Sequence, residues 1–131
     1  MDSQGCGISG FGIFDVTDPA NPVFISRGSL SDAIDVAIYE NYAYLPGRNC
    51  DDGIFKALFV EDLSDIHHPS RVNVLPGYYG GVEISNGYLY LGDGAKLQVM
   101  SLLNPVTPSE VGFIIFRIIF RILLSLGSML T

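Results

Sequence analysis

Residues 12–22 read Gly-Ile-Phe-Asp-Val-Thr-Asp-Pro-Ala-Asn-Pro, an apolar run that ends in a polar turn with two prolines. A version of this stretch returns at residues 58–69 as Leu-Phe-Val-Glu-Asp-Leu-Ser-Asp-Ile-His-His-Pro. It returns again at residues 97–108 as Leu-Gln-Val-Met-Ser-Leu-Leu-Asn-Pro-Val-Thr-Pro. Proline cannot donate to a strand ladder, and Asp and Asn bond back to their own backbone. Each copy therefore predicts a short β-strand followed by a tight turn, and the chain is expected to be a repeat protein.

The segments that follow the first two copies have the pattern of further strands. Ile34, Val36 and Ile38 alternate at period two, and Asn86-Gly87 favours a type I′ hairpin turn. The first meander is expected to contain strands at 11–16, 23–27, 34–39 and 42–45. An irregular stretch from 47 to 56 then leads into a second set of strands, expected at 57–62, 71–75, 81–84 and 88–91.

The repeat length indicates the fold class. If Ile13, Val60 and Val99 are equivalent, the copies are spaced by 47 and 39 residues. A period near 40 with four short strands per unit is typical of a β-propeller blade, which buries its faces only against neighbouring blades. We therefore predict an all-β partial β-propeller of four-stranded antiparallel blades over residues 11–112, with repeats starting near 11, 57 and 97 after a flexible lead-in at 1–10.

The copies at residues 12–23 and 97–105, together with Asn-Tyr-Ala-Tyr-Leu at 41–45, resemble the LVIVD repeat. The resemblance covers roughly residues 10–112 and implies propeller blades, usually about seven, in bacterial and archaeal proteins that are commonly exported or attached to the cell surface. It implies no catalytic residues. About two and a half copies are present, so the blades must persist as an open stack, assemble with copies of themselves, or be completed by other sequence.

The composition and charge of the chain limit the classes of partner that are expected. The chain has 131 residues, 48% of them hydrophobic, and a net charge of −7, which fits a protein with a core and disfavours nucleic acid as a partner. Cys6 and Cys50 show no metal-binding spacing; they pair in an oxidising compartment or remain free thiols. Residues 1–7 have neither a basic nor an apolar region, so no secretory signal is expected in this chain. Localisation outside the cytoplasm or at the cell surface rests on the family resemblance alone.

The hydrophobic tail at residues 113–131 departs from the repeat. Arg117, Arg121, Ser125 and Ser128 would share one narrow face of a helix whose other sides are apolar, so we expect a helical tail. The alternative is a strand, which the many isoleucines of the segment favour. Four interpretations stay open: a helix that lies in a membrane interface, a helix that spans a membrane, a helix that covers an exposed sheet edge, or the accidental end of a gene fragment. Membrane contact through this segment is one of the partner hypotheses.

The connection at residues 47–53 is the most site-like stretch, because the equivalent connection is only Asp93-Gly94-Ala95. The candidate binding residues are Arg48, Asn49, Asp51 and Asp52. Their spacing lacks the alternation and the distal glutamate of a calcium loop, so a contact loop for a partner or a solvated insertion is preferred over a metal site.

Other residue patterns favour structural roles. His67 and His68 are adjacent in a turn, where neighbouring side chains point in different directions and do not chelate a metal together. The aspartates that recur with the repeat are expected to form turns, with a ring of calcium ligands as the alternative. They are Asp15, Asp18, Asp62 and Asp65. Alternating tyrosines are interpreted as blade packing, with a sugar-binding platform as the alternative. They are Tyr42, Tyr44, Tyr88 and Tyr90.

No catalytic motif is present, and neither a catalytic residue nor a cofactor is predicted. The sequence therefore favours a non-enzymatic binding or scaffold module, a piece of a larger exported or surface protein, that binds a protein or surface partner or self-associates to complete its propeller. Two alternatives remain: a hydrolase or oxidoreductase built on a propeller, which rests on analogy of fold, and an interaction protein tethered to a membrane by its tail.

Overall fold

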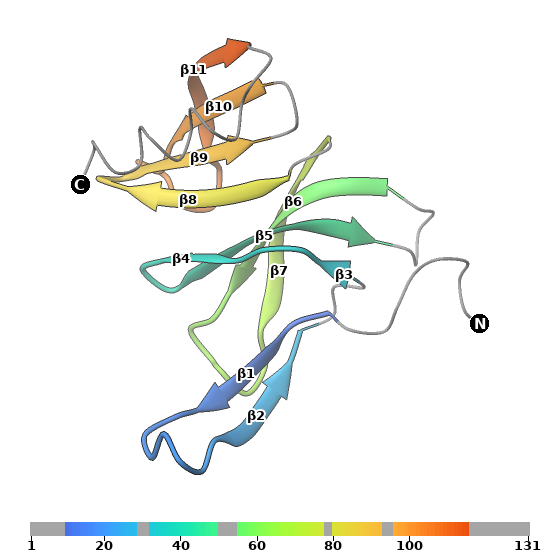
Figure 1. Cartoon of the computed structure of the whole chain (residues 1–131), viewed down its shortest axis with the longest axis vertical. Helices are drawn as coiled ribbons and strands as arrows, with labels where there is room; N and C mark the ends of the chain where they lie inside the picture. Colours follow the sequence, from blue (N-terminus) through green and yellow to red (C-terminus); the bar gives the residue numbers. More distant parts are fainter. Residues whose placement is uncertain (1–9, 29–31, 50–54, 78–79, 93–95, 116–131) are drawn as a thin grey trace.

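A computed structural model of the chain describes residues 10–28, 32–49, 55–77, 80–92 and 96–115. These residues form three antiparallel sheets and contain no helix, which confirms the all-β antiparallel prediction. A two-stranded sheet pairs β1 (Gly12–Asp15) with β2 (Val23–Arg27). The other two sheets follow it along the chain, and Figure 1 shows the three as successive layers.

The middle sheet is built around two long strands, β5 (Tyr42–Asn49) and β6 (Phe55–Asp62). On one side β5 pairs with β3 (Asp32–Ala33) and β4 (Ala37–Tyr39), and on the other side β6 pairs with β7 (Ser70–Pro76).

The upper sheet in Figure 1 has the order β11-β10-β9-β8. Its strands are β8 (Gly81–Ser85), β9 (Tyr88–Gly92), β10 (Lys96–Ser101) and β11 (Ser109–Ile115). The turn between β8 and β9 is the expected hairpin, with Asn86 and Gly87 both at positive φ, 53° and 77°.

The predicted division into meanders was wrong by half a repeat. The expected meander over 11–45 is split, because β1 and β2 form their own sheet while β3, β4 and β5 join the strands of the next copy. The cause is the pairing of β5 with β6, which runs without interruption from Tyr42↔Asp62 to Asn49↔Phe55. Each full sheet therefore combines the second half of one sequence repeat with the first half of the next.

The stretch from 47 to 56 was predicted to be irregular, and this too was wrong at both ends. Gly47 to Asn49 complete β5, and Phe55 and Lys56 begin β6. Gly47 permits this arrangement because β3 crosses very close to it: a Cβ added at Gly47 would lie 2.1 Å from the carbonyl oxygen of Asp32.

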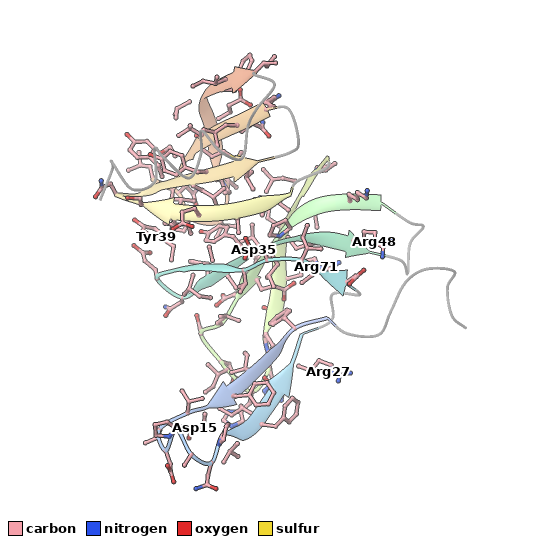
Figure 2. The ribbon with its side chains drawn as sticks, viewed as in Figure 1. Asp15, Arg27, Asp35, Tyr39, Arg48 and Arg71 are labelled. Atoms are coloured by element: carbon pink, nitrogen blue, oxygen red, sulfur yellow. The ribbon has the colours of Figure 1, made fainter. Side chains whose placement is uncertain are left out.

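The strand predicted at 34–39 is interrupted. Its period-two residues Ile34, Val36 and Ile38 are all more than half exposed, so their alternation does not mark a core face. The interruption lies at Asp35, whose carboxylate accepts hydrogen bonds from the backbone N–H of Val36 at 2.8 Å and of Val82 in β8 at 3.0 Å. Asp35 thus links the middle sheet to the upper sheet, and Figure 2 shows it between those layers.

The main core lies between the middle and upper sheets. The middle sheet contributes the buried side chains of Tyr44, Leu58 and Val60. The upper sheet contributes Val82, Leu89, Leu91, Met100 and Leu102. The opposite face of the middle sheet buries a second cluster of Ala43, Leu45, Ala57 and Phe59, against which Phe11 packs from the chain just before β1. Because β6 is buried on both faces, the middle sheet behaves as an internal blade of a stack.

Three hairpins confirm the sequence repeat at the level of register. In β1–β2, β6–β7 and β10–β11 the strands pair around a single bulge, located at Ile25, Val72 and Val111. These three residues occupy equivalent places, each three positions after the proline that ends the turn. The same motif therefore folds into the same hairpin three times, bulge included.

The expected helical tail does not begin at residue 113. Phe113, Ile114 and Ile115 belong to β11 and pair with Gln98, Leu97 and Lys96. The rest of the tail, residues 116–131, lies outside the described residues, as do the lead-in at 1–9, Cys6 and Cys50. Among the residues that the structure describes, there is no helix of the length and apolar character needed to cross a membrane.

Candidate functional site

The recurrent turn is held by two side-chain caps. The first is made by the residue that ends the strand, whose side-chain oxygen accepts the backbone N–H two positions later. This contact measures 2.8 Å at Asp15, 2.8 Å at Asp62 and 3.1 Å at Ser101. The second cap repeats the geometry three residues further on, at 3.1 Å for Asp18, 3.0 Å for Asp65 and 3.2 Å for Asn104. These are the turn-forming roles that the sequence predicted.

The same hydrogen bonds favour the ionised carboxylates. The side chain and backbone of Thr17 hold the pKa of Asp15 below its ordinary value, and those of Ser64 do the same for Asp62. The pKa of Asp18 is lowered by the Asn21 side chain and the Ala20 backbone. Each of these carboxylates accepts hydrogen bonds within its own turn. The described residues contain no group of three or more His, Cys, Asp or Glu side chains placed to hold a metal ion.

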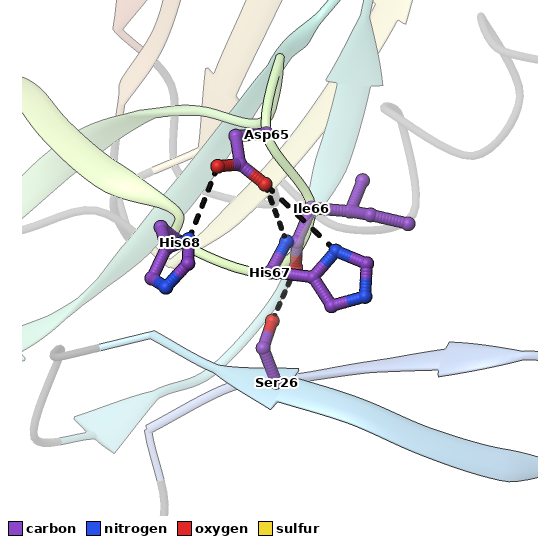
Figure 3. A network of polar contacts seen from close by, with 5 residues as sticks. All are labelled: Ser26, Asp65, Ile66, His67 and His68. Atoms are coloured by element: carbon purple, nitrogen blue, oxygen red, sulfur yellow. Dashed lines mark hydrogen bonds and ion pairs between the residues drawn. The ribbon is translucent and has the colours of Figure 1, made fainter.

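The turns also form the seams between sheets. Ser26 in β2 donates its hydroxyl to the carbonyl oxygen of Ile66, in the turn of the middle sheet (Figure 3). Asn73 in β7 occupies the equivalent place and donates from Nδ2 to the carbonyl oxygen of Val106 at 2.8 Å, in the turn of the upper sheet. Each turn therefore presents backbone acceptors to the sheet that precedes it.

Tyr44 adds a second bond to the later seam. Its hydroxyl donates to the carbonyl oxygen of Pro105 at 2.6 Å. Burial raises the pKa of the Tyr44 phenol, and the nearby charges of Tyr42 and Glu40 raise it further, so the hydroxyl stays protonated and available as a donor. Tyr44 is thus used for packing, since it is fully buried, whereas Tyr88 is 42% exposed.

His67 and His68 lie in the exposed turn as expected, with side chains 68% and 82% exposed. Both rings approach the Asp65 carboxylate between them, His68 Nδ1 at 3.1 Å and His67 Nδ1 at 3.8 Å (Figure 3). The hydrogen bond from His68 and the backbone N–H of His67 lower the pKa of Asp65. These contacts stabilise the turn.

The structure describes part of the predicted binding loop. Arg48 lies in β5, where its guanidinium Nη2 is 2.6 Å from Asp32 Oδ2, and this ion pair ties β3 to β5. The backbone of Asn49 ends the strand opposite Phe55. Asp51 and Asp52 lie outside the described residues. The loop joins two paired strands of one sheet, at the end where the Arg48 ion pair is formed, and its role as a contact loop stays a prediction.

The seam residues were missed by the sequence reasoning. Their signal was present: Ser26 and Asn73 are polar residues with apolar neighbours in the second strand of their hairpins, each four positions after the proline of its turn. Gly112 occupies the same place in the third copy and has no side chain to donate. Without the fold, however, the partner carbonyls 33 to 40 positions away could not be inferred.

Comparison with known proteins supports the repeat assignment. The LVIVD repeat model matches residues 31–49 and 76–114. The second match spans β8 to β11, so this match follows the upper sheet as it is paired in space. The first match spans β3 to β5, the first half of the middle sheet. No curated protein and no solved structure matches the chain. Two stretches of the chain thus match the LVIVD repeat, which is the repeat that its motifs resemble.

Proposed function

We propose that this chain is a non-enzymatic binding or scaffold module that works by docking a further blade of its own kind onto the β1–β2 hairpin. The partner is a second copy of the chain or another protein with the same repeat. In this proposal the turn that follows β1 accepts hydrogen bonds from an incoming blade, as the two later turns accept them from the preceding sheet within the chain.

The observation that carries the proposal is the first turn, at residues 17–22. It has the same two caps as the later turns. The later turns receive bonds from Ser26, Tyr44 and Asn73 through the carbonyl oxygens of residues 66, 105 and 106. Among the described residues, nothing donates to the equivalent carbonyl oxygens of Pro19 and Ala20. The first turn therefore has the geometry of the two later turns, but its carbonyl oxygens accept no such bond from the part of the chain that the structure describes.

The hairpin beside this turn exposes apolar side chains. Phe14, Val16, Val23 and Phe24 are each 54% to 60% exposed, and the rings of Phe14 and Phe24 contact each other edge to face at 5.5 Å between centroids. In the next hairpin, the paired positions equivalent to Phe14 and Phe24 are 61 and 71. They are packed within the stack, and Glu61 is fully buried. Phe14 and Phe24 are also paired directly across the hairpin, so they form an exposed apolar pair of the kind found at protein interfaces.

The proposal extends to the setting of the module. An exported or surface-attached protein, which the family resemblance implies, would present such a stack to partners outside the cytoplasm. The connection between β5 and β6, with Arg48, Asn49, Asp51 and Asp52, is proposed as an additional contact loop.

The test is the solution mass of the full chain over a range of concentrations, measured by light scattering and combined with small-angle X-ray scattering in mild detergent. A compact oligomer that dissociates on dilution is expected. Phe24→Arg should shift it to the monomer, because an arginine stands at the equivalent position 71 and is compatible with the hairpin fold. Ile38→Arg is the matched control, since Ile38 is 56% exposed but lies on β4, outside the hairpin.

Two results would contradict the proposal. An oligomer that survives Phe24→Arg but dissociates with Ile38→Arg would place the interface on the β4 edge. A chain that is monomeric at all concentrations, and that does not bind an added LVIVD-repeat blade, would exclude docking at the hairpin.

A further inference from the structure

An open cavity of about 430 Å³ lies where the middle and upper sheets meet at their turn ends. We call it the Tyr39/Tyr88 cavity. One wall is the end of β4 and its turn, with Tyr39 and Glu40. The other wall comes from the β8–β9 turn at Asn86, Gly87 and Tyr88. The floor is the turn that follows β10, from Ser101 to Leu103, and Pro105. Figure 2 shows Tyr39 at this end of the layers.

Two hydrogen bonds hold the walls of the cavity in place. Tyr44 bonds the carbonyl oxygen of Pro105, and the N–H of Leu102 bonds the carbonyl oxygen of Gly87 at 3.0 Å. The Tyr39 hydroxyl lies 3.9 Å from the point where a Cβ would stand on Gly87, so the two walls come close together there. A cavity with a braced floor and walls is preorganised for a ligand, which lowers the entropic cost of binding.

Glu40 is the one charged residue among the described residues that line the cavity. It adopts a left-handed backbone conformation with φ of 57°, which is unfavourable for a glutamate, while the equivalent place in the next hairpin is held by Asn86, a residue that tolerates it. The Glu40 carboxylate makes no hydrogen bond or ion pair with any residue that the structure describes. The turn therefore places a negative charge, with no ion-pair partner among the described residues, in a lining that also contains two tyrosines.

The chemistry of this lining selects a cation. Tyrosine rings attract an ammonium or guanidinium group through their negative faces, and a nearby carboxylate supplies the counter-charge. None of the described residues that line the cavity is basic, and the chain as a whole has a net charge of −7, which favours approach of a positive group. An anionic ligand would find no basic side chain among the described lining residues and would be repelled by Glu40.

We propose that the Tyr39/Tyr88 cavity binds a lysine or arginine side chain of a protein partner, with Glu40 as its counter-ion and the two tyrosines as its aromatic walls. This inference rests on the proposed function, since it takes the chain to be a binding module. It assigns a second contact point, at the seam between the middle and upper sheets and separate from the β1–β2 hairpin.

The test is an amide-detected NMR titration of the full chain with three capped amino acids: Nα-acetyl-lysine, Nα-acetyl-arginine and Nα-acetyl-norleucine N-methylamides. The lysine and arginine probes should shift the amides of Asn86, Gly87 and Leu103, with a Kd on the order of 1 mM. The norleucine probe has a similar chain length without the charge and should bind at least about 5-fold more weakly.

The matched variants are Glu40→Gln, which keeps the side-chain size, and Glu83→Gln, which removes an exposed carboxylate on β8 outside the lining. Glu40→Gln should weaken the lysine probe by about 5-fold, and Glu83→Gln should leave it unchanged. If Glu40→Gln alters the amide spectrum beyond the cavity, raising the salt concentration to about 0.5 M on the unmodified chain supplies the same comparison, because it screens the Glu40 charge.

Equal binding of the norleucine probe would overturn the proposal, as would an affinity insensitive to both Glu40→Gln and salt, or the absence of shifts up to about 20 mM probe. Failure here is distinguishable from failure of the proposed function. The oligomer test reports on the hairpin at Phe24, and the titration reports on Glu40, so either result can stand without the other.

Discussion

The hydroxyl of Tyr44 donates to the carbonyl oxygen of Pro105 at 2.6 Å, across 61 positions of sequence and across the seam between the middle and upper sheets. Because Tyr44 is fully buried, this bond satisfies a polar group that would otherwise be desolvated without compensation. We therefore expect Tyr44→Phe to lower the free energy of unfolding by about 1–2 kcal/mol, measured by urea denaturation followed by circular dichroism.

Tyr90 provides the control for this prediction. It stands at the position equivalent to Tyr44 in the next repeat, and its hydroxyl makes no hydrogen bond with any residue that the structure describes. Tyr90→Phe should change the free energy of unfolding by less than about 0.5 kcal/mol. An equal loss in both variants would show that the loss comes from the ring environment and not from the bond to Pro105.

The seam bond of Asn73 gives a second prediction. Asn73→Ala removes the donor to the Val106 carbonyl oxygen, a contact of 2.8 Å, and should lower the free energy of unfolding by about 1 kcal/mol. Gly112 occupies the equivalent place on β11, and a Cβ added there would meet nothing within 4 Å. Gly112→Ala should therefore be neutral or stabilising by about 0.5 kcal/mol, because it reduces the freedom of the unfolded chain. A stability loss with Gly112→Ala larger than with Asn73→Ala would contradict the seam account.

The buried carboxylate of Glu61 predicts a dependence on pH. Its side chain is fully buried, Oε2 lies 3.5 Å from Arg71 Nε, and Oε1 has no hydrogen-bond partner among the residues that the structure describes. Burial raises the pKa of Glu61 above its ordinary value of 4.5, and Arg71 opposes this only in part. The folded chain then holds the proton more tightly than the unfolded chain, so the contribution of Glu61 to stability falls as the pH rises above 4.5.

Glu61→Gln cannot ionise and should remove that fall. Denaturation at a series of pH values should show the variant gaining on the unmodified chain as the pH rises toward 7, by about 1 kcal/mol. Glu83→Gln, which changes an exposed carboxylate, is the control. A difference between Glu61→Gln and the unmodified chain that is constant over this range would show that the burial of Glu61 does not govern its ionisation.

The turn motifs could be predicted from sequence because every interaction that defines them is local. Asp15 and Asp62 cap N–H groups two residues away, so residue type and spacing are sufficient to identify them. The Asn86-Gly87 turn was predictable for the same reason, since its conformation depends on the two residues themselves. The repeat was recognised from these turns, and the fold class was predicted from the length of the repeat.

The pairing of strands could not be predicted in the same way. β5 could pair with β6 or end a separate sheet. The choice depends on backbone hydrogen bonds between the two strands, and the connection between them has no sequence pattern that predicts this pairing. The alternation at Ile34, Val36 and Ile38 was misleading, because the strand is interrupted at Asp35 by a bond to β8, 47 positions away. The seam contacts and the Tyr39/Tyr88 cavity require the same long-range placement, and so they became visible only in the folded chain.

The turn carboxylates predict the opposite pH dependence from Glu61. Hydrogen bonds from His68 and from the His67 backbone lower the pKa of Asp65. The unfolded chain then takes up the proton first as the pH falls, so the stability contributed by Asp65 is complete above its ordinary pKa of 3.8 and is lost as the pH falls through the folded pKa. The third repeat shows what a neutral cap can do, because Asn104 makes the same backbone contact to Val106 at 3.2 Å.

Asp65→Asn and Asn104→Asp are therefore reciprocal tests of the same turn. Asp65→Asn keeps the acceptor oxygen and should destabilise the chain near pH 7, with the difference from the unmodified chain shrinking as the acid protonates Asp65. Asn104→Asp should add a carboxylate whose stabilising effect appears only at the higher pH. Denaturation midpoints between about pH 2 and pH 7 measure both. If the effect of each variant on stability were the same at every pH, ionisation of the turn caps would contribute nothing to stability. The turns would then depend on hydrogen-bond geometry alone.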